Sequence, residues 1–427
     1  MTTSATVHPP TPTDPCEGDR LTFARVELAR ERQAPYVRRT PVEHSADLGV
    51  ITGREVFLKL ENQQHTGAFK LRGALARLLA MDPAERARGV LTASAGNHGQ
   101  GVALAARLLE THATVVLPVG APLAKLAAIQ RHGAEIVLEG ASYDEAHAHA
   151  VALAAERDLV YIHAFDDPDV MAGQGALAME LLEDVPDLDA LLVPVGGGGL
   201  ISGVATAARA MRPGMRVYGV QAAGSGALAA SFKAGEIQTH PSSTIADGIA
   251  VKTPGARTFA VIQSLVDDVV TVSDEAIARA ILLLLERHKQ LAEGAGATAL
   301  AALLEGAIPA GPRRVGVIVS GGNIDPILLG KVLQHGLVSA GRYLAIQTWL
   351  DDKPGQLHDL TSLLTTERVN ILHVGIHRLG PYTALGRVGL DLIVETRDHA
   401  HAEYVLGRIR AAGYPAEESL GSEGGTR

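Results

Sequence analysis

Short apolar runs alternate with longer alanine-rich segments through most of the chain. Each run ends in a glycine-rich or polar loop, and a segment with helical spacing follows. Buried parallel strands are continuously apolar, and crossover helices separate them along the sequence. The pattern therefore predicts an α/β protein with parallel strands at residues 56–60, 90–92, 113–117, 136–138, 190–195, 216–221 and 314–320.

The pattern changes near residue 340, where we place a domain boundary. Strands are predicted at residues 343–350, 370–377 and 388–394, and helices at 356–367 and 399–411. This βαββαβ order predicts a ferredoxin-like unit. At the other end, the Thr- and Pro-rich composition of residues 1–19 predicts a flexible arm.

Composition narrows the class of protein. The chain has 427 residues, of which 47% are hydrophobic and 20% charged, so it can bury a large core. Its net charge of −9 opposes binding to phosphate backbones, and we expect no nucleic-acid partner. The single Cys16 excludes an intrachain disulfide. Neither a secretion signal nor a membrane-length apolar run is evident, so we expect a cytoplasmic protein that does not bind membranes.

Two polar segments contain side chains that are unusual for their positions. Lys70 follows a glycine-bearing loop at a predicted helix start, where the helix dipole disfavours a cation. It is either a solvated surface charge or a functional amine. Residues 92–101 form a polar loop between a strand and a helix, which is either an ordinary turn or a loop that directs N–H groups and amides at an anion.

Two further segments are rich in glycine. Four glycines, Gly196 to Gly199, join a buried strand to a helix, and their entropic cost is best explained by close approach of the backbone to a phosphate. Their spacing fits neither a dinucleotide fingerprint nor a P-loop, so the phosphate need not belong to a nucleotide. Ser320 begins the last segment, at a strand end where ligands of open α/β sheets bind.

Together these segments resemble the fold-type II family of pyridoxal phosphate enzymes, most closely the threonine and serine dehydratases. The resemblance implies a catalytic domain over residues 20–335, built from two open twisted α/β lobes, with the small lobe (about 89–166) inserted in the large one. It implies that Lys70, next to Phe69, binds the cofactor covalently, that Asn97 bonds its ring hydroxyl and that Ser320 bonds its pyridine nitrogen. The implied phosphate ligands are Gly196, Gly197, Gly198, Gly199 and Leu200, and the implied substrate-binding residues are Ser94, Ala95, Gly96, Asn97 and His98.

Differences within the family refine the predicted reaction. A serine at the pyridine nitrogen need not keep it protonated, which favours loss of a β-hydroxyl over transamination. Serine racemases of this fold carry a second serine where this chain has Ala95, and alanine cannot transfer a proton, so elimination is favoured over racemisation. Ala68 also departs from the family's usual serine.

We expect no bound metal. Relatives that bind divalent cations have carboxylates where this chain has Gln221 and Gly224 to Gly226. Asp247 and Glu293 match family positions near the active site, but their roles stay open.

The tail resembles an ACT regulatory domain, with residues 352–357 at the position of that family's ligand loop. The resemblance implies binding of an amino-acid effector, with feedback by isoleucine or valine as in isoleucine biosynthesis, and pairing of subunits in a homo-oligomer, either a tetramer or a dimer. The alternative is a dimerisation domain without a ligand.

The family resemblance implies an enzyme that deaminates L-threonine to 2-oxobutanoate and ammonia, with side activity converting L-serine to pyruvate. An L-serine or hydroxyaspartate dehydratase is the alternative enzyme. A non-catalytic amino-acid sensor is a third possibility, against which the intact Lys70, Asn97 and Ser320 argue.

Overall fold

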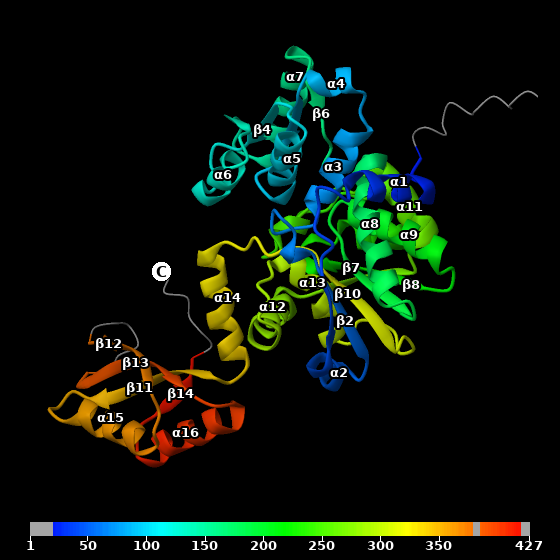
Figure 1. The fold of residues 1–427 in the computed structure, drawn as a ribbon. Coiled ribbons are helices and arrows are strands. Elements are labelled where there is room, and N and C mark those ends of the chain that lie inside the picture. The colour runs from blue at the N-terminus through cyan, green and yellow to red at the C-terminus, as the bar shows by residue number, and fades with distance from the viewer. Residues whose placement is uncertain (1–19, 379–384, 420–427) are drawn as a thin grey trace, which may run out of the picture. The chain divides into compact units, whose positions relative to one another are not determined.

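The computed structural model describes residues 20–378 and 385–419, so the predicted arm at residues 1–19 lies outside the described residues. Tertiary contacts divide the chain after Asp325 into two units. The first unit contains two sheets and the second contains one (Figure 1). None of the described helices combines the length and apolar character needed to cross a membrane.

The larger sheet of the first unit has six strands in the order β1-β2-β10-β7-β8-β9. β1 is antiparallel to β2, and the other pairs are parallel. Every residue of β7 is buried, as expected for a parallel strand covered on both faces. The strands are β1 (Val42–Ser45), β2 (Glu55–Leu60), β7 (Ala190–Pro194), β8 (Arg216–Ala222), β9 (Asp268–Val272) and β10 (Arg314–Val319).

Helices surround this sheet and form the large lobe with it. The most buried is α8, which begins after the N-cap Asp167 with a proline at its first position, a favourable start. The helices are α1 (Phe23–Gln33), α2 (Ala46–Thr52), α3 (Lys70–Ala80), α4 (Pro83–Ala87), α8 (Pro168–Asp184), α9 (Gly199–Met211), α10 (Ala227–Ala234), α11 (Ala256–Leu265), α12 (Asp274–His288) and α13 (Gly294–Leu304), with short 3-10 helices η2 (Glu61–Gln63), η3 (Ala223–Ser225) and η4 (Asp247–Ile249).

The smaller sheet has four parallel strands in the order β5-β4-β3-β6. Its helices connect successive strands, so this small lobe has the predicted strand–loop–helix repeat. The predicted α/β class is confirmed. The elements are β3 (Val90–Ala93), β4 (Ala113–Leu117), β5 (Glu135–Leu138), β6 (Val160–Tyr161), α5 (Asn97–Leu108), α6 (Leu123–Gln130) and α7 (Tyr143–Glu156).

The second unit begins with α14 (Pro326–Ser339) and continues as an antiparallel sheet in the order β12-β13-β11-β14. Its β11 alternates buried with less buried residues, as the sequence pattern predicts for a strand with one covered face. The predicted βαββαβ order is confirmed by β11 (Tyr343–Asp351), α15 (Gln356–Thr366), β12 (Ile371–His377), β13 (Arg387–Glu395), α16 (His399–Ala411) and β14 (Ala416–Glu418).

Candidate active site

One cavity of about 630 Å³ collects the four segments that the sequence singles out. It opens at the carboxyl ends of the strands of both lobes, where loops from neighbouring parallel strands meet. It is lined by every predicted site residue: Phe69, Lys70, Ser94, Ala95, Gly96, Asn97, His98, Gly196, Gly197, Gly198, Gly199, Leu200 and Ser320.

Lys70 places a buried amine in this cavity from the first residue of α3. Its Nζ donates a hydrogen bond to the carbonyl oxygen of Ala164 at 2.9 Å. Burial lowers the Lys70 pKa to about 8, against a smaller opposing effect of the Glu293 carboxylate. A neutral amine is therefore available near physiological pH, which covalent attachment to an aldehyde requires.

The glycine loop has no space for side chains. A Cβ on Gly197 would lie 2.5 Å from the Phe165 ring, and one on Gly199 would lie 2.8 Å from the Phe165 carbonyl oxygen. Gly198 has φ +99°, a conformation that favours glycine. Because α9 begins at Gly199 without a side-chain cap, its first N–H groups are available to an anion in the cavity.

Asn97 is held by two neighbours at the start of α5. Its Nδ2 donates to Glu293 Oε1 at 2.6 Å, and its Oδ1 accepts from Asn323 Nδ2 at 2.8 Å. These bonds determine which amide atom faces which partner. Burial raises the Glu293 pKa to about 7, and the nearby Asp247 carboxylate adds to this effect. Ser320, only 3% exposed, lies at the end of β10 in the same cavity.

His98 is oriented differently from the other residues of its loop. Its side chain is buried, and its Nε2 lies 3.2 Å from the carbonyl oxygen of Ile162. Burial, together with the Lys70 charge, lowers the His98 pKa to about 3, so the ring is neutral. The anion-binding capacity of the loop therefore resides in its backbone N–H groups and the Ser94 hydroxyl.

His163 is a cavity residue that sequence reasoning missed. Its Nδ1 accepts hydrogen bonds from the N–H groups of Phe165 and Asp166, at 3.2 and 2.8 Å. Burial lowers its pKa to about 4, so the ring is neutral and carries its proton on Nε2. No sequence signal identifies it, because its bonding depends on local backbone geometry. Asn323, also missed, lies in the same short segment as Ser320 and could have been found there.

Two ion pairs connect the lobes at the same cavity. Lys125 of α6 pairs with Asp247 of η4 at 2.5 Å, and Lys252 pairs with Asp144 of α7 at 2.6 Å. All four residues line the cavity. The charges therefore join the small lobe to the segment that contains Asp247 and Lys252.

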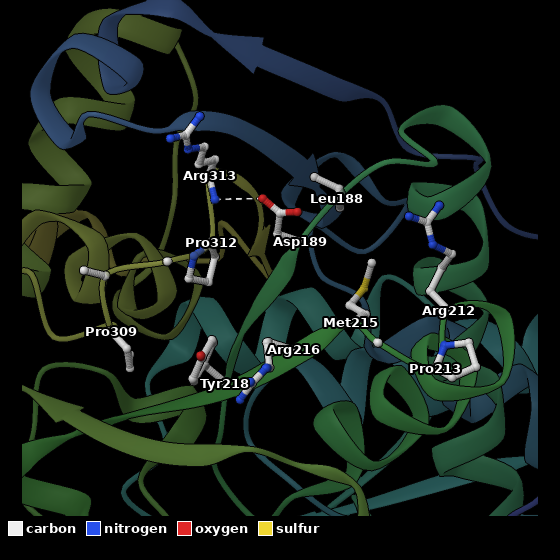
Figure 2. Close-up of a pocket in the computed structure, with 13 residues that line it drawn as sticks. Leu188, Asp189, Arg212, Pro213, Met215, Arg216, Tyr218, Pro309, Pro312 and Arg313 are labelled. Carbon is white, nitrogen blue, oxygen red and sulfur yellow. Dashed lines mark hydrogen bonds between the residues drawn. The ribbon is translucent and has the colours of Figure 1, made fainter.

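A second cavity, of about 800 Å³, lies at the amino ends of β7, β8 and β10. Figure 2 shows the side chains of Arg212, Arg216 and Arg313 pointing in different directions. Asp189 accepts the backbone N–H of Arg313 at 2.7 Å. Because these donors do not converge on one point, we place the active site in the first cavity.

The first cavity fits pyridoxal phosphate, the cofactor that the sequence resemblance implies. A glycine cradle that a Cβ would fill can hold the phosphate, and the Lys70 amine can bind the aldehyde. Asn97 and Ser320 supply polar groups for the ring. Among residues 20–378 and 385–419, no three His, Cys, Asp or Glu side chains are grouped so that they could hold a metal ion.

The lowered Lys70 pKa predicts how cofactor attachment depends on pH. Below about pH 8 the amine is mainly protonated and cannot attack, so the attachment rate should rise with pH and level off above that value. The measurement is the rate of absorbance change when pyridoxal phosphate is added to cofactor-free protein. A rate that still rises steeply near pH ~10 would indicate an ordinary lysine and contradict the burial argument.

Comparisons with known proteins agree with this site. The model of the family "Pyridoxal-phosphate dependent enzyme" matches residues 34–321. An L-threonine ammonia-lyase of Thermotoga maritima is 41% identical over 395 residues, covering 92% of this chain and 98% of that protein. The maize serine racemase structure has a TM-score of 0.71 at 38% identity, covering 75% of this chain and 98% of that one. A threonine deaminase structure, from the organism abbreviated T.th., has a TM-score of 0.68 at 41% identity, covering 71% and 99%. This chain therefore belongs to the family of pyridoxal-phosphate dependent enzymes, with the fold-type II architecture.

Proposed function

We propose that the protein deaminates L-threonine to 2-oxobutanoate and ammonia. The observation that carries this proposal is a cavity in which a buried Lys70 amine lies with an uncapped glycine loop and the Asn97 and Ser320 side chains. A relative that spans nearly the whole chain is named L-threonine ammonia-lyase, which supports threonine as the substrate.

The residues of this chain perform separate tasks in the reaction. Bound pyridoxal phosphate supplies an electron sink for a carbanion at the substrate α-carbon. The N–H groups at the start of α9 bind a phosphate, and those of the Ser94 to His98 loop bind the substrate carboxylate. Lys70 Nζ accepts the α-proton, because its lowered pKa keeps part of the amine neutral. Loss of the β-hydroxyl follows, and water later replaces the amino group to give the oxo acid and ammonia.

Substrate range is the less determined part of the proposal. L-serine differs from threonine only by the β-methyl group, so we propose side activity that yields pyruvate. An L-serine or hydroxyaspartate dehydratase is the alternative. The likeness to maize serine racemase raises a further comparison, but Ala95 in the cavity cannot donate or accept a proton. We therefore expect elimination to exceed racemisation.

The test of the proposed function uses purified full-length protein supplied with pyridoxal phosphate. Incubation with L-threonine should release 2-oxobutanoate and ammonia in equal amounts, with slower pyruvate release from L-serine and little D-serine. If pyruvate or oxaloacetate forms much faster, from L-serine or hydroxyaspartate, the alternative dehydratase is correct. A protein that takes up no pyridoxal phosphate would leave only the non-catalytic sensor.

We further propose that the C-terminal unit is an ACT-like regulatory domain, with limits of about 342–427 beside a catalytic domain of 20–335. Its βαββαβ order supports this proposal, as does the loop before α15, where Gly355 has φ +96°. Isoleucine or valine is the proposed effector, and a cytoplasmic homo-oligomer, either tetramer or dimer, is the proposed assembly.

Effector titrations of the full-length protein test the regulatory role. Isoleucine and valine should each be titrated into the threonine assay with the parent and with Gly355→Val, which strains the left-handed loop. We expect the variant to shift the effector midpoint at least about tenfold without changing the basal rate. The control is Gly407→Ala on α16, where a Cβ would meet open space. Flat titrations of the parent with both amino acids would remove the feedback proposal.

A further inference from the structure

The helix that carries Lys70 begins without local stabilisation. Its N-cap, Phe69, makes no side-chain capping hydrogen bond, and its first turn contains no acidic residue. That turn instead contains two cations, Lys70 and Arg72, at the end of the helix where the dipole disfavours positive charge. The position of the first turn of α3 must therefore be set by tertiary contacts.

Arg72 makes such contacts with two buried carboxylates. Its Nε and Nη2 donate to the two oxygens of Glu61, each at 2.9 Å, and its Nη1 donates to Glu180 Oε1 at 2.8 Å. The side chains of Arg72 and Glu61 are 0% exposed, and that of Glu180 is 7% exposed. A guanidinium bonded on both sides is restrained in direction as well as in distance.

Lys59 and Thr40 complete the network. Lys59 Nζ donates to Glu180 Oε2 at 2.6 Å and to the Thr40 carbonyl at 2.7 Å, and Thr40 Oγ1 donates to Glu61 Oε1 at 2.5 Å. The two cations balance the two carboxylates. Buried ion networks of this kind are costly to desolvate, and well-packed apolar side chains are often as stable in their place. Geometry therefore explains the network better than stability does.

The network lies behind α3 as seen from the cavity. At 3.6 residues per turn, Lys70 and Arg72 project about 200° apart around the helix. Glu180 lies on α8, which α3 also approaches closely at Gly73. The Gly73 N–H donates to Gln174 Oε1 at 3.2 Å, and a Cβ on Gly73 would overlap the Gln174 amide. Restraint from behind thus sets where the Lys70 side chain enters the cavity.

We propose that Arg72, bonded to Glu61 and Glu180, is a positioning residue for Lys70. It sets the rotation and axial position of the first turn of α3, so that the Lys70 amine lies beside the Ala164 carbonyl in a buried environment. Only the kinetic part of the test rests on the proposed threonine reaction. The chemical reactivity of Lys70 tests the positioning role independently.

The test compares Arg72→Lys and Glu180→Gln with a matched control. Arg72→Lys keeps the charge but loses the fork that bonds two carboxylates, and Glu180→Gln removes one of those charges with little change in shape. The control, Arg77→Lys, alters an arginine of the same helix that pairs with Asp167 at 3.2 Å, away from Lys70. Trace acetylation of cofactor-free protein across a pH series, read by peptide mass spectrometry, reports the ionisation of Lys70. Thermal unfolding and threonine kinetics are measured in parallel.

In the parent and the control, the midpoint of Lys70 acetylation should lie near pH 8. In Arg72→Lys and Glu180→Gln we expect it to rise by about one pH unit, because a displaced amine is better solvated. The kcat should fall at least about tenfold with KM changed less than about threefold. If Arg72→Lys does not fold, Glu180→Gln decides the question. An unchanged midpoint in a folded variant overturns the proposal, whereas a parent inactive toward threonine overturns only the proposed function.

Discussion

Replacing Lys70 with alanine is expected to lower kcat for L-threonine deamination by at least about a thousandfold. The variant loses both the amine that binds the cofactor and the base that accepts the α-proton, and no other lysine shares its buried position beside Ala164 among the described residues. Steady-state release of 2-oxobutanoate measures the effect. The visible absorbance of the purified protein should change as well, because the covalent link cannot form.

Two controls distinguish lost chemistry from lost structure. Lys233→Ala removes an exposed lysine of α10 and should leave kcat unchanged. Adding a small primary amine to Lys70→Ala should restore part of the activity, because the shortened side chain leaves space for a diffusible base. Turnover above about a tenth of the parent value would show that another group performs the proton transfer.

Replacing Gly197 with alanine is expected to weaken pyridoxal phosphate binding about a hundredfold, equivalent to losing one or two charge-assisted hydrogen bonds. The added Cβ would lie 2.5 Å from the Phe165 ring, so the ring or the loop must move. Either movement misdirects the N–H groups that meet the phosphate at the start of α9. Absorbance titration of cofactor-free protein measures the dissociation constant.

The matched control is Gly214→Ala, where a Cβ would meet nothing within 4 Å. It should bind the cofactor like the parent. Thermal unfolding of both cofactor-free variants separates a local effect from unfolding of the lobe. Unchanged cofactor affinity in Gly197→Ala would mean that the phosphate binds elsewhere, and the assignment of the glycine loop would then be wrong.

The strands and most helices could be predicted from the sequence because their signals are local. A buried parallel strand such as β4 is a continuous apolar run, and a half-buried strand such as β11 alternates. The residues of the cavity were predictable for a related reason. Lys70, Gly198 and Ser320 follow strands or begin helices, and parallel strands bring those positions to one edge of a sheet.

Other features depend on partners that are distant in the chain. Arg72 and Lys59 read in the sequence as ordinary charges, yet both bond to Glu180, 108 and 121 residues away. The ion pair of Lys125 with Asp247 joins residues 122 apart. β2 lies beside β10, although nothing in either strand's sequence names the other. No local pattern could predict these pairings.

The sequence by itself determined the class of fold, the order of elements in both units and the residues that supply the amine, the glycine loop and the ring contacts. Each of these depends on local backbone preferences and on the spacing of apolar residues. Only the tertiary structure decided that Glu293 and Asn323 orient Asn97, that His163 is neutral, and that a buried ion network holds the helix of Lys70. The physical reason is that burial and hydrogen bonding change the charge and direction of a side chain, and both depend on neighbours that folding brings together.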